Sequence, residues 1–213
     1  MNLLSGPAAK QRGALLLADI SGYTSFLQGI TDAHAELIAE PDEPAPVYSL
    51  LSSLLDTMAT VLAPSFEVMK FEGDAIFAVA PDGPQSVHGE SVIACLRTCY
   101  AAFGERLAQG RAELTCECNS CSLVNGLDLK FVLHHGDYFA QRIAGQEEVV
   151  GPDVIVAHRL LKNHARDLVG ERPYVLLTDA AAADLDVSIH DMLPLTERYE
   201  QMPPIAVHVL PLE

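Results

Sequence analysis

The segment ALLLADISGYT, at residues 14–24, is the feature that most constrains how this chain can fold. Its succession of apolar residues predicts a short buried strand. The strand ends at Asp19, and the Ser-Gly pair that follows Ile20 predicts a turn. A carboxylate at the very end of an apolar strand is the first candidate for a functional group.

Beyond this strand, helical and strand patterns alternate along the chain. Apolar spacing of 3.6 residues predicts helices, and short apolar runs on either side of turn residues predict hairpins. The predicted helices lie at 24–39, 47–62 and 86–109 (ended by Gly110) and within 151–165, the hairpins at 66–80 and 127–143 (with a turn at 135–137), and two later strands at 173–178 and 203–212. This order predicts a single α+β domain over residues 1–213, with a ferredoxin-like, mainly antiparallel sheet covered by helices. Residues 111–126 form a cysteine-rich insertion in it.

The composition excludes several classes of partner. The chain has 213 residues and a formal net charge of −16, which leaves no electrostatic footprint for nucleic acid or an anionic membrane surface. No apolar run approaches the ~20 residues that cross a bilayer. The N-terminal residues lack the pattern of a signal peptide, so we expect a cytoplasmic protein without a membrane partner.

A second carboxylate, Asp74, lies in the Gly-Asp turn of the first predicted hairpin. In a ferredoxin-like core the first strand is next to such a hairpin, so Asp19 and Asp74 are expected to converge. Mg²⁺ prefers one or two carboxylates, with phosphates and waters completing the shell. Two carboxylates that share two ions would suit phosphoryl or nucleotidyl transfer. The alternative is that both aspartates are ordinary turn residues.

Four motifs in this sequence resemble those of class III nucleotidyl cyclases, in the same order. They are ADISGYTSFL, KFEGDAIFAVA, LKFVLHHGDY and GPDVIVAHRLL, and together they cover nearly the whole chain. The cysteine insertion and the HRLLKN segment are similar, more narrowly, to a small bacterial cyclase-like family of uncharacterised function.

The resemblance implies a purine nucleoside triphosphate as substrate and a role for each matching residue. Asp19, Asp74 and the Ile20 carbonyl would bind Mg²⁺ or Mn²⁺, and the turn made by Ser21, Gly22, Tyr23 and Thr24 would approach the phosphates. Lys70 and Glu148 would contact the base, and Arg159 would stabilise charge on the transferring phosphate. A carboxylate beside a lysine matches adenine, so ATP is favoured over GTP. In this family the site lies between two subunits, which implies a homodimer.

Two departures from the family pattern weaken the expectation of activity. Ile155 stands where the family has an asparagine that contacts the ribose, and Asn163 lies eight residues further along, ~12 Å away on a helix. The triphosphate-binding lysine near the C-terminus has no match, and that loop offers only Arg198. A slow cyclase and an inactive nucleotide-binding sensor therefore both remain open, and a metal or redox module is a third possibility.

The third possibility rests on the spacing of Cys116, Cys118 and Cys121. Three thiolates within six residues can share one metal ion, so a structural Zn²⁺ is one interpretation. A redox-sensitive thiol cluster and free surface thiols are the others. Cys95 and Cys99 share a helix face and are interpreted as small core residues. His134 and His135 match a turn of the cyclase family in which histidine is structural, so we assign them no catalytic role.

Overall fold

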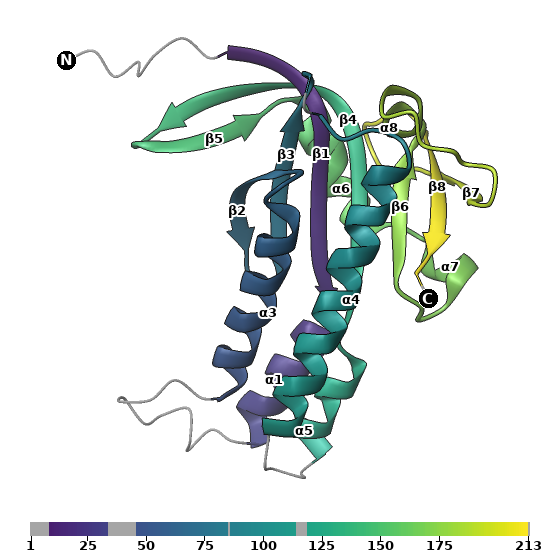
Figure 1. Cartoon of the computed structure of the whole chain (residues 1–213). Helices are drawn as coiled ribbons and strands as arrows, with labels where there is room; N and C mark the ends of the chain where they lie inside the picture. The colour runs from purple at the N-terminus through teal and green to yellow at the C-terminus, as the bar shows by residue number, and fades with distance from the viewer. Residues whose placement is uncertain (1–8, 34–45, 85, 114–118, 213) are drawn as a thin grey trace.

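The computed structural model describes residues 9–33, 46–84, 86–113 and 119–212, and Figure 1 shows their arrangement. The strands are β1 (Ala9–Ser21), β2 (Glu67–Glu72), β3 (Ala75–Pro81), β4 (Asp128–Ile143), β5 (Gln146–Val150), β6 (Tyr174–Thr178), β7 (Leu193–Glu197) and β8 (Ile205–Pro211). The α-helices are α1 (Tyr23–Ala33), α3 (Pro46–Leu62), α4 (Glu90–Glu113), α5 (Asn119–Ser122), α6 (Pro152–Arg159), α7 (Arg166–Val169) and α8 (Asp179–Asp184). Two short 3₁₀ helices, η1 (Leu123–Gly126) and η2 (Leu160–Lys162), complete the elements.

The strands form one mixed sheet in the order β2-β3-β1-β4-β6-β8-β7, and β5 pairs with β4. All neighbouring pairs are antiparallel except β4 and β6. The order β2-β3-β1-β4, with helices between β1 and β2 and between β3 and β4, is the ferredoxin-like arrangement. The predicted α+β fold class is therefore confirmed.

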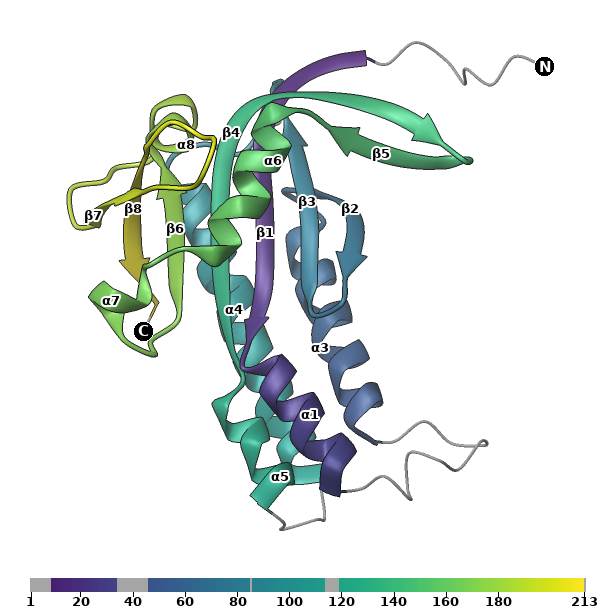
Figure 2. The same cartoon turned by 180° about the vertical axis from the view of Figure 1, so that it is seen from behind.

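Helices cover the two faces of the sheet unequally. Helices α3 and α4 lie across one face, and α6 lies on the other, as the two views show (Figures 1 and 2). Strand β1 serves both cores because its side chains alternate: Leu16 and Ala18 join the α3–α4 core, whereas Leu15 and Leu17 join the α6 core. The same alternation places Asp19 on the α6 face.

The predicted turn at residues 135–137 is wrong, because β4 continues through it without interruption. Strand β4 pairs with β1 from Asp128 to Ala140. Gly136 is needed for close packing rather than for a turn: a Cβ atom there would lie 2.3 Å from Cγ of Asp153 in α6. The hairpin turn comes later, at Ala144 and Gly145, both with positive φ.

The predicted end of the long helix at Gly110 is also wrong, since α4 runs on to Glu113. Gly110 is buried against α3, where a Cβ atom would clash with the side chain of Leu50. Here the glycine allows two helices to approach closely. The predicted helix at 24–39 is α1 as far as Ala33, and its remaining residues lie outside the described part of the chain.

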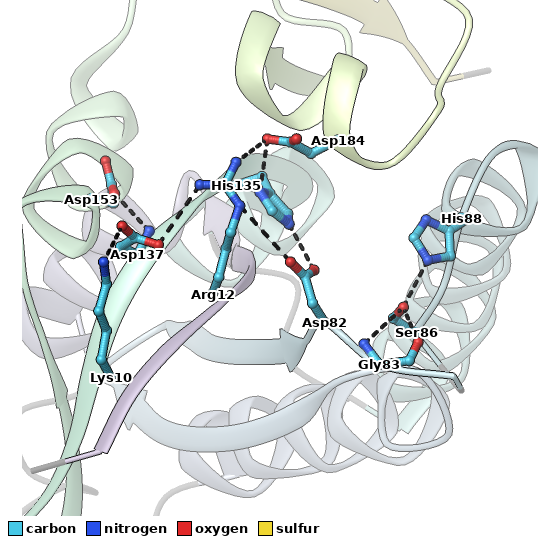
Figure 3. A network of polar contacts seen from close by, with 10 residues as sticks. All are labelled: Lys10, Arg12, Asp82, Gly83, Ser86, His88, His135, Asp137, Asp153 and Asp184. Carbon is cyan, nitrogen blue, oxygen red and sulfur yellow. Dashed lines mark hydrogen bonds and ion pairs between the residues drawn. The ribbon is translucent and has the colours of Figure 1, made fainter.

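A network of polar side chains connects several elements at the end of the sheet away from α1 (Figure 3). The buried His135 lies between two carboxylates, with Nε2 at 2.9 Å from Asp82 and Nδ1 at 3.1 Å from Asp184. Arg12 contacts Asp184 at 2.6 Å. The neighbouring His134 lies 2.9 Å from the Thr178 hydroxyl, and burial lowers its pKa. These contacts support a structural role for both histidines.

Within the ranges that the structure describes, no helix is long and apolar enough to cross a membrane.

Candidate functional site

Asp19 and Asp74 come together at the end of the sheet from which α1 emerges. Asp19 pairs in register with Ala75, the residue after Asp74, and the Ile20 N–H donates to the Asp74 carbonyl oxygen at 3.1 Å. Burial and the negative charge of Asp19 raise the pKa of Asp74. Two carboxylates that repel each other in a half-buried position form a natural site for a cation.

A lysine that the sequence analysis missed already contacts this pair. Lys130 of β4 lies opposite Asp19 in the register of β1 and β4, and its Nζ is 2.9 Å from Asp19 Oδ2. The two side chains are only 20% and 17% exposed. The same ammonium group donates to the carbonyl oxygen of Leu161 at 3.4 Å. Only the strand register could have revealed this contact, because Lys130 follows Asp19 by more than a hundred residues.

The predicted turn at Ser21–Thr24 is shorter in the structure, because Ser21 still belongs to β1, Tyr23 and Thr24 belong to α1, and Gly22 alone lies between them. Gly22 adopts a φ of +84°, and a Cβ atom there would lie 2.7 Å from the carbonyl oxygen of Gly126. The first N–H groups of α1 have no partner within the helix and point out of its N-terminus. Burial and the charge of Asp74 raise the pKa of the Tyr23 phenol.

A second polar group lies on the same face of the sheet, between β2, β5 and α6. Lys70 Nζ is 3.1 Å from Glu72 and 3.5 Å from Glu148. Burial alone would lower the pKa of Lys70, but its hydrogen bonds and ion pairs with both carboxylates raise it. Glu72 also lies 3.1 Å from Nε2 of His158, whose Nδ1 donates to the carbonyl oxygen of Val154 at 2.8 Å.

A β-bulge in β2 sets the direction of this second group. The register between β2 and β3 shifts between Val68 and Lys70, after which Lys70 pairs with Phe77. The ring of Phe77 lies 4.9 Å from the ring of His158, on the α6 face. Bulges of this kind re-aim side chains next to functional sites. Glu72 and His158 were not among the predicted site residues, because neither a bulge nor a contact between β2 and α6 has a signal in the sequence.

A hollow of about 410 Å³ lies between β2 and the β4–β5 hairpin. Met69 and Glu147, the chain neighbours of Lys70 and Glu148, line it. The hydroxyl of the buried Tyr138, also in the lining, has no hydrogen-bond partner among the described residues. Burial, with the charge of Glu67, raises the pKa of Tyr138 to about 12, so this phenol stays a hydrogen-bond donor.

Helix α6 presents Arg159 and Ile155 at the surface. Ile155 is 58% exposed, and both residues line a shallow hollow of about 330 Å³. Lys162 contributes a second cation to its wall. Asn163 cannot replace the missing asparagine, because its amide donates to the Leu160 carbonyl at 2.6 Å and its oxygen accepts from Tyr174.

The two polar groups stay apart within one chain. Among the described residues, no hydrogen bond or ion pair joins the carboxylates at residues 19 and 74 to Lys70, Glu148 or Arg159. The structure thus assembles each of the two groups, and each includes a residue that the sequence analysis did not name. The two groups do not contact each other.

The predicted cysteine site falls mostly outside the described residues. Cys116 and Cys118 lie there, while Cys121 is buried in α5 and packs in the α3–α4 core. In α4, Cys99 is fully buried, and burial together with Cys95 raises its pKa to about 12, which fits an inert core thiol.

Comparison with known proteins identifies the family. Residues 51–167 match the sequence profile of a protein family of unknown function, DUF2652. The uncharacterised protein Rv2561/Rv2562 of Mycobacterium tuberculosis is 34% identical over 166 residues, which cover 76% of this chain and 72% of that protein. The chain belongs to the DUF2652 family.

Solved structures show which fold this DUF2652 chain has. The guanylyl cyclase Cya2 matches with a TM-score of 0.70 and 15% identity, covering 96% of this chain and 93% of that one. The adenylyl cyclase CyaB from P. aeruginosa gives 0.65 and 13%, with 98% of each chain covered. A class III adenylyl cyclase-like ATP-binding protein from Pseudomonas aeruginosa gives 0.59 and 18%, covering 88% of this chain and 38% of that one. The chain therefore has the fold of class III cyclase domains.

In this DUF2652 chain, the carboxylates of Asp19 and Asp74 are adjacent and repel each other. Carboxylate oxygens are the ligands that Mg²⁺ or Mn²⁺ prefers. Among the residues that the structure describes, however, no three His, Cys, Asp or Glu side chains form a group that could hold a metal. The donor set fits an ion that takes its remaining ligands from a phosphate and water.

Proposed function

We propose that this protein is a class III nucleotidyl cyclase-like domain that binds a purine nucleoside triphosphate together with Mg²⁺ or Mn²⁺. The observation that carries the proposal is the meeting of Asp19 and Asp74 at the strand end next to α1, in a chain with this fold. Residues Ser21–Thr24, where β1 passes into α1, would supply backbone N–H groups for phosphate oxygens.

The Lys70–Glu148 pair supports a purine as the base. An ammonium group 3.5 Å from a carboxylate offers a donor to a ring nitrogen and an acceptor to an exocyclic amino group. Adenine presents this combination, so ATP is favoured over GTP.

The reaction would be attack of the ribose 3′-hydroxyl on the α-phosphate, with release of pyrophosphate and formation of a 3′,5′-cyclic nucleotide. A bound divalent ion would lower the pKa of the hydroxyl and stabilise charge on the phosphate. Asp19, Asp74 and the Ile20 carbonyl would hold the ion, and Arg159 would stabilise the developing phosphate charge. The chain would then be a phosphorus–oxygen lyase.

A homodimer would bring the two separate polar groups together. One copy would supply the carboxylates, and the other would supply Lys70, Glu148 and Arg159 across a two-fold axis. We also propose a cytoplasmic, signalling role, and a structural Zn²⁺ bound by Cys116, Cys118 and Cys121 of the C-x-C-x-x-C insertion, which would place the chain in a small bacterial subfamily.

A catalytically inactive nucleotide-binding sensor is the alternative. The exposed apolar side chain of Ile155 cannot hydrogen-bond a ribose, and losing an orienting group can reduce a rate on the order of 10²-fold. The structural similarity to a class III adenylyl cyclase-like ATP-binding protein supports this alternative.

One experiment separates these outcomes. The purified protein is incubated with ATP or GTP and Mn²⁺, cyclic product is measured by mass spectrometry, and nucleotide binding is measured by calorimetry. Cyclic product that disappears in Asp19→Asn supports the cyclase. Binding without product supports the sensor, and the absence of both contradicts the proposed function.

A further inference from the structure

We propose that Lys130 is a built-in counter-ion of the carboxylate pair, and that a divalent metal must displace its ammonium group from Asp19 in order to bind there. The inference rests on the proposed function in placing the metal at Asp19 and Asp74. It adds a residue that controls when the metal binds.

The position of Lys130 is determined by the sheet rather than by a flexible surface contact. Lys130 and Asp19 are register partners on two inner strands of the sheet, which pair along thirteen positions from Ala9 to Ser21. The Nζ–Oδ2 distance is 2.9 Å, and both side chains are four-fifths or more buried. The Leu161 carbonyl oxygen accepts a further hydrogen bond from the ammonium at 3.4 Å. The ammonium group is thus held from two sides.

The charges around Asp19 explain why Lys130 would weaken the binding of a free metal ion. Asp19 and Asp74 together carry two negative charges, and Lys130 offsets one of them before any metal arrives. A divalent ion at the same carboxylate lies close to the ammonium and is repelled by it, in a partly buried place where screening by water is weak. Free metal ions therefore bind poorly. A metal that arrives with a triphosphate brings negative charge that offers Lys130 a new partner.

The test is direct measurement of Mn²⁺ binding, by electron paramagnetic resonance, with no nucleotide present. Lys130→Met keeps the length of the side chain and removes its charge, and we expect it to bind Mn²⁺ about tenfold more tightly than the unmodified protein. Adding Asp19→Asn to Lys130→Met should abolish the gain. The matched control is Lys10→Met, because Lys10 forms an ion pair of the same length, 2.9 Å, with Asp137 at the other end of the sheet. That control should bind Mn²⁺ like the unmodified protein.

Several results would overturn the inference. They are equal Mn²⁺ affinity in Lys130→Met and the unmodified protein, an equal gain in Lys10→Met, or no Mn²⁺ binding by either folded protein. Thermal melts establish that each variant is folded, and Lys130→Gln replaces the methionine variant if that one is not. Calorimetry with ATP and Mn²⁺ is a separate arm: failure of the unmodified protein to bind nucleotide contradicts the proposed function but leaves the competition between Lys130 and the metal as measured.

Discussion

At the scale of single residues, the carboxylate end of the sheet is a place of unfavourable charge. Burial and the neighbouring Asp19 both favour the protonated form of Asp74, and only Lys130 and a backbone hydrogen bond act in the opposite direction. Perturbed pKa values of this kind cluster at functional sites. The cost should be visible in the stability of the ligand-free protein.

Asp74→Asn should raise the melting temperature of the metal-free protein at pH 7. The folded-state pKa of Asp74 is raised above its unfolded value of 3.8, so its contribution is most favourable below that value and is lost as pH rises through the folded pKa. A neutral amide at position 74 does not lose stability in this way as the pH rises. The difference in melting temperature between the variant and the unmodified protein should therefore shrink towards pH 4. Differential scanning fluorimetry from pH 4 to pH 8 measures both trends.

Asp56→Asn, on the exposed face of α3, is the matched control and should leave the melting temperature unchanged. A lower melting temperature for Asp74→Asn at pH 7 would show that Asp74 stabilises the metal-free fold, contrary to this account.

Ile155→Asn should restore a ribose contact on α6. Because Ile155 is 58% exposed, an asparagine fits without disturbing the core. We expect tighter ATP binding or faster cyclisation, by on the order of 10-fold to 10²-fold, since an orienting group is gained. Ile155→Ala, which removes the apolar side chain without adding an amide, should show no such gain. Equal behaviour of the two variants would mean that residue 155 does not face the ribose.

At the scale of elements, the position of α6 on β4 decides where Arg159 and His158 lie. Gly136 leaves room for Asp153, whose carboxylate accepts a hydrogen bond from the Asp137 N–H at 2.7 Å. This contact fixes the first turn of α6 against the strand. A side chain at position 136 would push the helix outwards.

Gly136→Ala is expected to destabilise the protein by about 1–3 kcal/mol, the usual cost of overpacking. The matched change is Gly104→Ala in α4, where a Cβ atom meets nothing within 4 Å. That variant should be stabilised by about 0.5–1 kcal/mol, because alanine is the better helix former. Urea denaturation measures both. If Gly136→Ala were as stable as Gly104→Ala, the close contact between α6 and β4 would not hold in solution.

At the scale of the whole molecule, the two polar groups occupy one face of the sheet without touching. The carboxylates lie where α1 begins, and the Lys70 group lies between β2, β5 and α6, the face seen in Figure 2. A second copy of the chain, related by a two-fold axis, would place the complementary groups opposite each other twice. This is the expected form of the active protein.

Complementation between variants tests the shared site. Asp74→Ala and Arg159→Ala should each be inactive alone, since each removes one half of both sites. Mixed dimers regain one intact site, so random exchange of subunits should restore up to about a quarter of the unmodified cyclase activity. The measurement is cyclic nucleotide by mass spectrometry after mixing, with subunit exchange followed by native mass spectrometry. Exchange without recovery would exclude a site split in this way.

The sequence by itself determined the kinds of element and their order, because apolar periodicity and turn residues act locally. The buried strand that carries Asp19, the Gly73–Asp74 hairpin and the helix before Pro64 are all present, although the strand is longer than predicted and runs from Ala9 to Ser21. The glycines at 110 and 136 were misinterpreted as local signals. Their role is to let distant elements approach, and nothing near them in the chain reports that.

Only the tertiary structure decided which charged residues meet. Lys130 reaches Asp19 through the register of β1 and β4, and Glu72 reaches His158 across the space between β2 and α6. Strand register and helix placement depend on contacts between residues far apart in the chain, which a pattern of single residues does not encode. The sequence therefore predicted the two aspartates, whereas only the register of the sheet revealed the lysine that contacts Asp19.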